Sequence, residues 1–202
     1  VYVVVTNLFL DWLTAKLKYT WLDRDSDIDL TNVVSGAIPI YTTRSDAQDK
    51  TMDQWKLGVE LYPLADLDLG LDLTYEDHDY DFNNSSRTDE TWQKVYTDLT
   101  WRATSMVTLN GFVGFEDVEI DTSKRTNLAL LPQLIQTTDD DFWTYGVVAK
   151  LAATEQLSFV FSWQHDESDG ALDFTSLTTT TYNDVTESDD YSRKQLEAKA
   201  IY

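Results

Sequence analysis

The sequence contains no cysteine among its 202 residues. This absence excludes a disulfide framework, a thiolate metal site and a cysteine nucleophile. Basic residues are also scarce, with 15 Lys and Arg against 36 Asp and Glu and a formal net charge of −21. A nucleic-acid-binding protein neutralises phosphates with Lys and Arg, so no nucleic-acid partner is expected.

Long apolar runs are missing as well, so the sequence contains no candidate transmembrane helix. Transmembrane β-strands are not excluded by this, because they show only an alternation of apolar and polar residues that averaged hydropathy does not detect. Aromatic residues make up 13% of the chain, which argues against acidic disorder. The length suits one domain or part of a larger one.

What the sequence does contain is a period of two. The stretch LDLGLDLTYEDHDYDF, at 67–82, alternates leucine with small or acidic residues and then becomes a run of carboxylates. Residues two apart in an extended chain share a face, so the alternation predicts a strand with one apolar face. The same pattern predicts nine strands in all, at about 1–6, 13–21, 55–61, 67–75, 95–101, 107–115, 143–151, 157–163 and 196–202.

The connections between these strands alternate between short and long. Tight links are expected at 7–11, 62–66, 102–105 and 152–156, and long segments at 23–53, 76–91, 116–141 and 165–190. The long segments hold 28 of the 36 acidic residues, so the negative charge lies at one end of an up-and-down sheet. A run such as EDHDYD therefore marks the point where a strand emerges into water.

Two environments could cover the apolar face of such a sheet. In a soluble sandwich it packs on a second sheet, and strands then average about six residues with short turns at both ends. The strands here run about ten to twelve residues, near the roughly nine to eleven that cross a bilayer at a tilt. Trp and Tyr gather near the strand ends, where an interfacial girdle would place them. We therefore expect an all-β, antiparallel, up-and-down transmembrane β-barrel in the bacterial outer membrane, with short turns on one side and long acidic loops on the other.

Residues 1–202 are expected to form a single β-barrel domain or a segment of a larger barrel. Bacterial single-chain barrels have an even number of strands, whereas nine are predicted here. Either the first hairpin is miscounted or the chain is a segment, and we favour the segment because the sequence opens within a strand and closes directly after one. Tyr202 could instead be the terminal aromatic residue that resembles an outer-membrane assembly signal.

Two stretches carry a narrower resemblance. LKYTWLDRDSDIDL, at 17–30, and TDLTWRATSMVTLNGFVGFEDVEID, at 97–121, resemble the MtrB/PioB-type porins that sheath multihaem cytochromes in outer-membrane electron conduits. The sequence lacks the N-terminal region with a Cys pair that some members have. The resemblance implies that the chain insulates and positions a multihaem c-type cytochrome, with haem on that partner, no cofactor of its own and no redox chemistry in this chain.

Metal and catalytic motifs are weak. His78 and His165 stand beside carboxylates, which could suggest a metal site, but without fixed ligand spacing we interpret them as solvated loop residues. The aspartates from Asp23 onward lack the glycine that a calcium loop needs at its sixth position, where Ile28 stands. Loosely bound divalent cations, bridging to lipopolysaccharide, are expected at most at a rim made of Asp23, Asp25, Asp27, Asp77, Asp79 and Asp81. No nucleophile elbow, phosphate loop or zinc signature occurs, so no enzyme is expected.

The polar face of the predicted strands is the most plausible place for function. If the alternation holds, it lines a pore with Lys16, Lys18, Lys56, Glu60, Asp68, Asp72, Lys94, Asp98, Lys150, Glu197 and Lys199. The alternative is a ladder of paired charges that fills a narrow barrel and conducts nothing.

Three functions are compatible with these patterns. A passive porin would enrich cations at its acidic mouth. A sheath for a multihaem cytochrome would have a wide lumen plugged by protein. A soluble carbohydrate-binding β-sandwich would use the exposed aromatic residues instead. The first two place the chain among membrane lipid and lipopolysaccharide, where it forms or encloses a transmembrane passage.

Overall fold

The computed structural model describes residues 1–25, 34–35, 38–39, 49–80, 85–125, 133–176 and 185–201, and every regular element in them is a strand. The strands are β1 (Tyr2–Leu10), β2 (Leu13–Arg24), β3 (Val34–Ser35), β4 (Ile38–Pro39), β5 (Lys50–Leu64), β6 (Leu67–Tyr80), β7 (Ser85–Trp101), β8 (Val107–Arg125), β9 (Gln133–Ala152), β10 (Ser158–Ser176) and β11 (Val185–Ile201). In this part of the chain no helix is long and apolar enough to cross a membrane.

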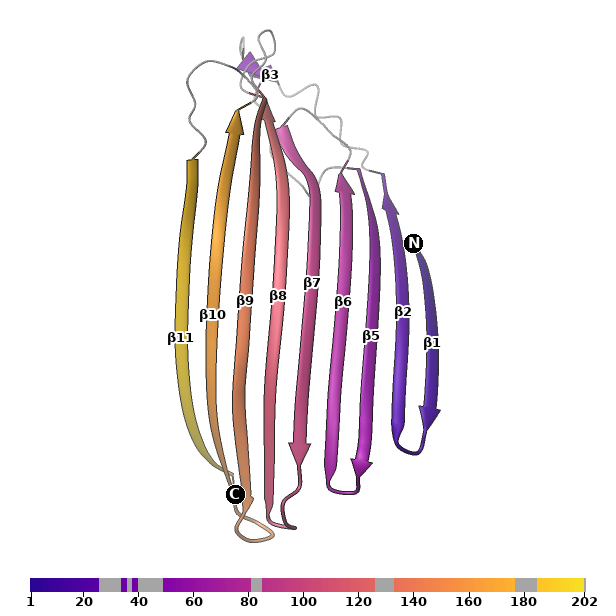
Figure 1. The fold of residues 1–202 in the computed structure, drawn as a ribbon, viewed down its shortest axis with the longest axis vertical. Coiled ribbons are helices and arrows are strands. Elements are labelled where there is room, and N and C mark those ends of the chain that lie inside the picture. Colours follow the sequence, from indigo (N-terminus) through magenta and orange to yellow (C-terminus); the bar gives the residue numbers. More distant parts are fainter. Residues whose placement is uncertain are drawn as a thin grey trace.

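Nine strands form one sheet in the order β1-β2-β5-β6-β7-β8-β9-β10-β11, and β3 and β4 form a separate pair. Figure 1 shows the meander, with the short turns at the lower end of the view. The turns at 11–12 and 65–66 are so short that each can only return the chain beside the strand it has just left. The prediction of nine antiparallel up-and-down strands is confirmed.

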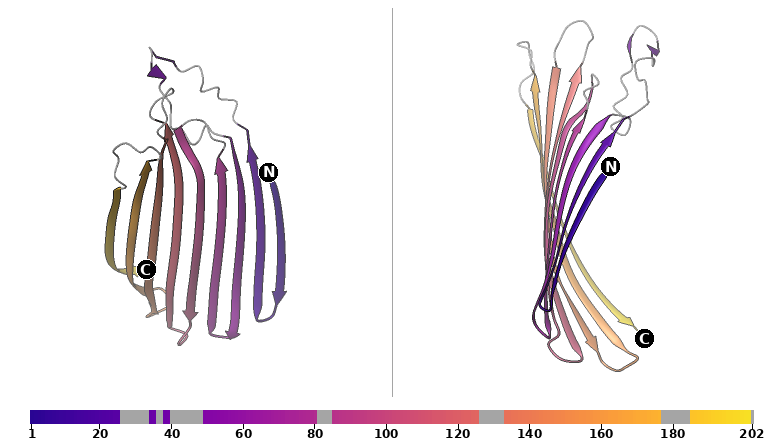
Figure 2. Two further views of the ribbon diagram at one scale, coloured as in Figure 1. Left: turned by 45° about the horizontal axis from the view of Figure 1, so that its top comes forward. Right: turned by 90° about the vertical axis from the view of Figure 1, so that its right-hand side faces the viewer.

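The large sheet is a single twisted layer, and β1 and β11 are its two open edges (Figure 2). Its apolar side chains are therefore uncovered by the rest of the described structure. Tyr80 and Val118 are the buried hydrophobic residues, whereas Leu196 is 83% exposed and Phe161 is 52% exposed. A soluble sandwich would bury one face of this sheet under a second one, so that alternative is not favoured.

The strands continue well beyond the boundaries that the sequence predicts. β8, β9 and β10 hold 19, 20 and 19 residues, and together with β11 they take up most of the segments expected as loops at 116–141 and 165–190. β6 likewise runs through most of EDHDYD, and β1 runs through most of the link expected at 7–11. These boundaries are wrong because backbone pairing does not depend on side-chain polarity, so acidic residues can continue a ladder that apolar residues begin.

Candidate functional site: the two faces of the sheet

The register of the sheet assigns every strand residue to one of two faces. We call the face that carries Leu67, Leu69, Leu71 and Leu73 the outer face, and the opposite one the inner face. All eleven predicted pore-lining residues share the inner face: Lys16, Lys18, Lys56, Glu60, Asp68, Asp72, Lys94, Asp98, Lys150, Glu197 and Lys199. That they line a pore stays a prediction, because register alone does not show what lies in front of the face.

The outer face carries an apolar band that begins near the short turns. On β6 it runs over nine residues, from Leu67 to Tyr75, before Asp77 follows on the same face. On β9 it runs from Leu151 back to Trp143, again nine residues, before Asp141. This length equals a transmembrane β-strand of about nine to eleven residues. On six strands the outer-face apolar residue farthest from the short turns, next to the carboxylates, is aromatic: Trp21, Trp55, Tyr75, Phe115, Trp143 and Trp163.

These six aromatic residues, the upper girdle, cross the sheet obliquely. Following the paired residues from strand to strand leads from Trp21 on β2 to Ala171 on β10, six strand spacings away. The girdle residue of β10 is Trp163, which lies eight residues nearer the short turns than Ala171. At about 3.4 Å per residue and about 4.8 Å per strand spacing, the girdle descends about 27 Å over about 29 Å of sheet. If the girdle lies level in a membrane, the strands tilt by about 43°, within the roughly 35–45° of outer-membrane barrels.

Charge divides unevenly between the two faces. The outer face holds a belt of carboxylates above the girdle: Asp23, Asp53, Asp77, Asp79, Asp89, Asp117, Glu119, Asp121, Asp139, Asp141, Glu167, Asp169, Asp173 and Asp190. Lys194 is the one outer-face Lys or Arg among the strand side chains that the structure describes. Inner-face carboxylates are interspersed with Lys and Arg. Among the described strand residues, the net negative charge therefore lies mainly on the outer face.

Several of the predicted pore-lining residues form ion pairs across the inner face. Lys94 Nζ lies 3.0 Å from Glu116 Oε1, and Lys199 Nζ lies 2.8 Å from Glu197 Oε1. Asp68 pairs with Arg102, which lies in the turn after β7. The ladder of paired charges that the sequence predicts as an alternative to a conducting pore is thus partly present.

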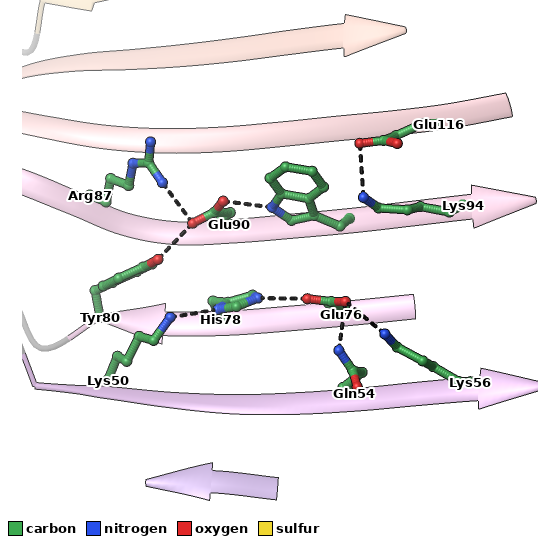
Figure 3. Close-up of polar contacts among 11 residues, drawn as sticks. Lys50, Gln54, Lys56, Glu76, His78, Tyr80, Arg87, Glu90, Lys94 and Glu116 are labelled. Carbon is green, nitrogen blue, oxygen red and sulfur yellow. Dashed lines mark hydrogen bonds and ion pairs between the residues drawn. The ribbon is translucent and has the colours of Figure 1, made fainter. Parts of the chain in front are cut away.

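Above the girdle level, a hydrogen-bonded network connects β5 and β6 on the inner face (Figure 3). Lys50 Nζ lies 3.2 Å from His78 Nδ1, and His78 Nε2 lies 3.4 Å from Glu76 Oε2. An ammonium group can only donate, so Nδ1 accepts and Nε2 carries the proton toward Glu76. Gln54 donates to the other oxygen of Glu76 at 2.6 Å. Burial, followed by the charge of Arg24, lowers the pKa of Lys50.

Glu90 on β7 is the centre of a second cluster in Figure 3. It is 5% exposed and accepts hydrogen bonds from Tyr80 Oη at 2.6 Å, Trp92 Nε1 at 2.6 Å and Arg87 Nη1 at 2.9 Å. Burial alone would raise the pKa of Glu90, but these hydrogen bonds and the charge of Arg87 hold it below its ordinary value. Burial and the neighbouring Glu90 raise the pKa of Tyr80 to about 12.

The sequence interpretation missed this cluster, although one signal for Glu90 was available. Glu90 continues the even-numbered alternation of Lys94 and Asp98 on β7. Arg87 was harder to place, because of a register shift between Arg87 and Asp89. Before this shift the odd-numbered residues of β7 lie on the inner face, and after it the even-numbered ones do. Arg87 thereby pairs with Thr122 and joins the inner face.

Inner-face glycines allow side chains of neighbouring strands to lie flat on the sheet. A Cβ on Gly170 would lie 2.6 Å from Oδ1 of Asp140, its partner across the ladder. A Cβ on Gly58 would lie 3.0 Å from Oδ1 of Asp72, which is again the ladder partner. The two aspartates extend over their glycines, so they lie along the wall instead of projecting from it.

The predicted cation rim is divided by the pleat of the sheet. Asp23, Asp77 and Asp79 lie on the outer face, His78 between the last two lies on the inner face, and Asp25 follows the end of β2. Asp27 and Asp81 lie outside the described residues. His78 and His165 lie in strands and are 8% and 7% exposed, so the interpretation of both as solvated loop residues is wrong. No group of three His, Asp or Glu side chains is placed to hold a metal ion in the described ranges.

Comparison with known proteins agrees with this geometry. The copper transporter OprC superposes with a TM-score of 0.76 at 7% identity, covering 98% of this chain and 32% of that one. The ferric yersiniabactin uptake receptor FyuA from Yersinia pestis superposes with a TM-score of 0.50 at 9% identity, covering 93% and 31%. Identities this low show the fold alone, and the chain spans about a third of the length of both structures.

Sequence comparison identifies the family. No curated protein matches the chain. The model of the family described as outer membrane beta-barrel porin, MtrB/PioB, matches residues 3–202, which is nearly the whole sequence. The chain therefore belongs to the MtrB/PioB family of outer membrane β-barrel porins.

Proposed function

We propose that the chain is part of the wall of a wide outer-membrane barrel, that this barrel encloses a multihaem c-type cytochrome, and that the wall itself is not an enzyme. Family membership supports the barrel, and the resemblance to porins that sheath cytochromes supports the occupant. The cytochrome would carry the haem, because this chain has no cysteine for covalent haem attachment.

The comparison with OprC supports a wide barrel rather than a narrow pore. The chain, whose large sheet has nine strands, covers 32% of the length of OprC, so a barrel of that size would need strands beyond this sheet. A barrel of about eight strands is filled by its own side chains. A much larger one leaves a lumen that a folded protein can occupy.

The observation that carries the proposal is a set of flat, charge-paired groups on the inner face. Asp72 and Asp140 lie along the sheet over glycines, and Lys94 and Lys199 are held in ion pairs. Exposed aromatic side chains such as Tyr96 and Phe142 share this face, and the combination suits close contact with another protein surface. A porin that selects solutes by charge needs a constriction with unpaired charge instead.

The placement of the carboxylates also weakens the case for a cation-selective porin. The belt above the girdle, which includes Asp77 and Asp79 on β6, lies on the outer face, so its carboxylates do not line the mouth of a passage on the inner side. We propose that the apolar band contacts membrane lipid and that this belt lies beside lipopolysaccharide. Divalent cations at its aspartates stay a prediction.

The test is the visible absorption spectrum of the full-length protein, extracted from membranes in mild detergent and purified without denaturation. We expect a Soret band in stoichiometric amount, from haem on a co-purifying partner. A colourless preparation with the barrel intact would contradict the enclosed cytochrome. Conductance in a planar bilayer would then show whether the lumen is an open pore.

A further inference from the structure

The carboxylate belt of the outer face is interrupted at one place. Lys194 on β11 lies directly opposite His165 on β10, and both point to the outer face. Opposed residues have Cβ atoms about 4.5–5.5 Å apart, so the two side chains share one small area. The other described strand lysines lie on the inner face, including Lys199 on the same strand as Lys194.

Both residues keep polar atoms without a partner in the described part of the chain. Lys194, on the edge strand β11, has no hydrogen bond or ion pair there, and its side chain is exposed. His165 is 7% exposed, with its ring 5.0 Å from the Tyr145 ring and 6.5 Å from the Trp163 ring between centroids. Its Nε2 lies 3.7 Å from Glu167 Oε2, while the buried Nδ1 has no hydrogen-bond partner.

The position of this pair relative to the girdle suggests what it meets. Trp163 is the girdle residue of β10, and His165 is the next residue above it on the outer face. Lys194 is likewise the first residue above Leu196, the last apolar residue of β11. The pair thus lies at the depth of lipid headgroups, directly above an exposed apolar surface that includes Phe161 and Leu196.

We propose that Lys194 and His165 form a binding site for the phosphate group of a membrane lipid. The exposed Lys194 ammonium donates to the phosphate, the largely buried His165 lies directly opposite it on the neighbouring strand, and the acyl chains lie on Phe161 and Leu196. The surrounding carboxylates repel anions from the rest of the belt, so they direct a phosphate to this one place. The site is independent of whether the barrel encloses a cytochrome.

Native mass spectrometry of the detergent-solubilised full-length protein, titrated with phosphatidic acid or with phosphatidylcholine, tests the site. We expect the wild type to bind phosphatidic acid more tightly. Lys194→Gln should weaken that binding about fivefold, the effect of losing one basic contact at a membrane surface. His165→Gln should weaken it in the same direction, and phosphatidylcholine binding should not change in either variant.

Lys199→Gln is the matched control, because it removes a lysine from the same strand but from the inner face. Phosphatidic acid binding should be unchanged in it. Equal binding by Lys194→Gln and the wild type would overturn the proposal, as would an equal loss in Lys199→Gln. Displacement of the lipid by inorganic phosphate at a similar concentration would mean that the site takes a small anion and not a lipid.

Discussion

At the scale of single residues, Glu90 is the best-defined group of the inner face. Its carboxylate accepts three hydrogen bonds from side chains of its own strand and of β6. Replacing it by glutamine keeps the shape but removes the charge that Arg87 faces. We expect Glu90→Gln to lower the free energy of unfolding by about 2 kcal/mol, as for hydrogen bonds to charged groups. Thermal unfolding of the full-length protein in detergent measures this.

Glu119→Gln is the control for that substitution, because Glu119 is exposed on the outer face. It should change the stability by no more than about 0.5 kcal/mol. The pKa of Glu90 is lowered in the folded state, so its contribution is complete above the ordinary pKa of glutamate and is lost as the pH falls through the lowered value. Equal effects of the two substitutions would argue against the cluster.

Asp141 shows the opposite situation on the outer face. Burial, and then the like charge of Asp117, which lies directly across from it on β8, raise the pKa of Asp141. Its charged form is therefore unfavourable in the folded protein, and stability falls as the pH rises from the unfolded to the folded pKa. Asp141→Asn should stabilise the protein by about 0.5 kcal/mol at neutral pH, the scale of one cross-strand pair. The gain should shrink in acid, where the wild type is protonated, and a gain that grows in acid would contradict this account.

At the scale of the strands, the packing of β9 between its neighbours depends on Gly146. A Cβ there would lie 2.5 Å from the backbone oxygen of Trp163 and 2.7 Å from Phe112 Cζ. The strands must separate to admit it, so Gly146→Ala should cost about 1–3 kcal/mol. Gly111 on the outer face of β8 has no atom nearer than 4.0 Å to its added Cβ. Gly111→Ala is thus the matched control and should leave the melting temperature in detergent unchanged or slightly raised.

At the scale of the whole molecule, the assignment of faces is the central claim. The chain has no native cysteine, so single cysteines can be introduced without background. We expect a spin label on Leu71→Cys, on the outer face, to be relaxed strongly by molecular oxygen, which concentrates in lipid, and a spin label on Asp72→Cys to be relaxed much less, because only the first points toward lipid. Power-saturation EPR of the two labelled variants, reconstituted in lipid, decides this. The reverse pattern would exchange the two faces and remove the basis for the inner wall.

The alternation of apolar and polar residues along each strand was enough to predict most of the fold. Leu67 to Tyr75 predicted one apolar face of nine residues, and the structure shows that band unchanged. The same alternation, read past Tyr75, could have placed His78 with Lys56 and Asp72 on the inner face. It was not applied there, because acidic residues in sequence suggest a solvated loop. The cluster around Glu90 also depends on the register shift before Asp89, which no single-strand pattern contains.

By itself the sequence determined the strand number, the meander, the apolar band and the family, because each follows from residues close together in the chain. Only the tertiary structure decided the tilt of the girdle, the outward placement of the acidic belt and the pairing of Lys194 with His165. Those features depend on the register between strands. Register is set by the turns and bulges of the whole sheet acting together, and a slip of one residue would exchange its two faces.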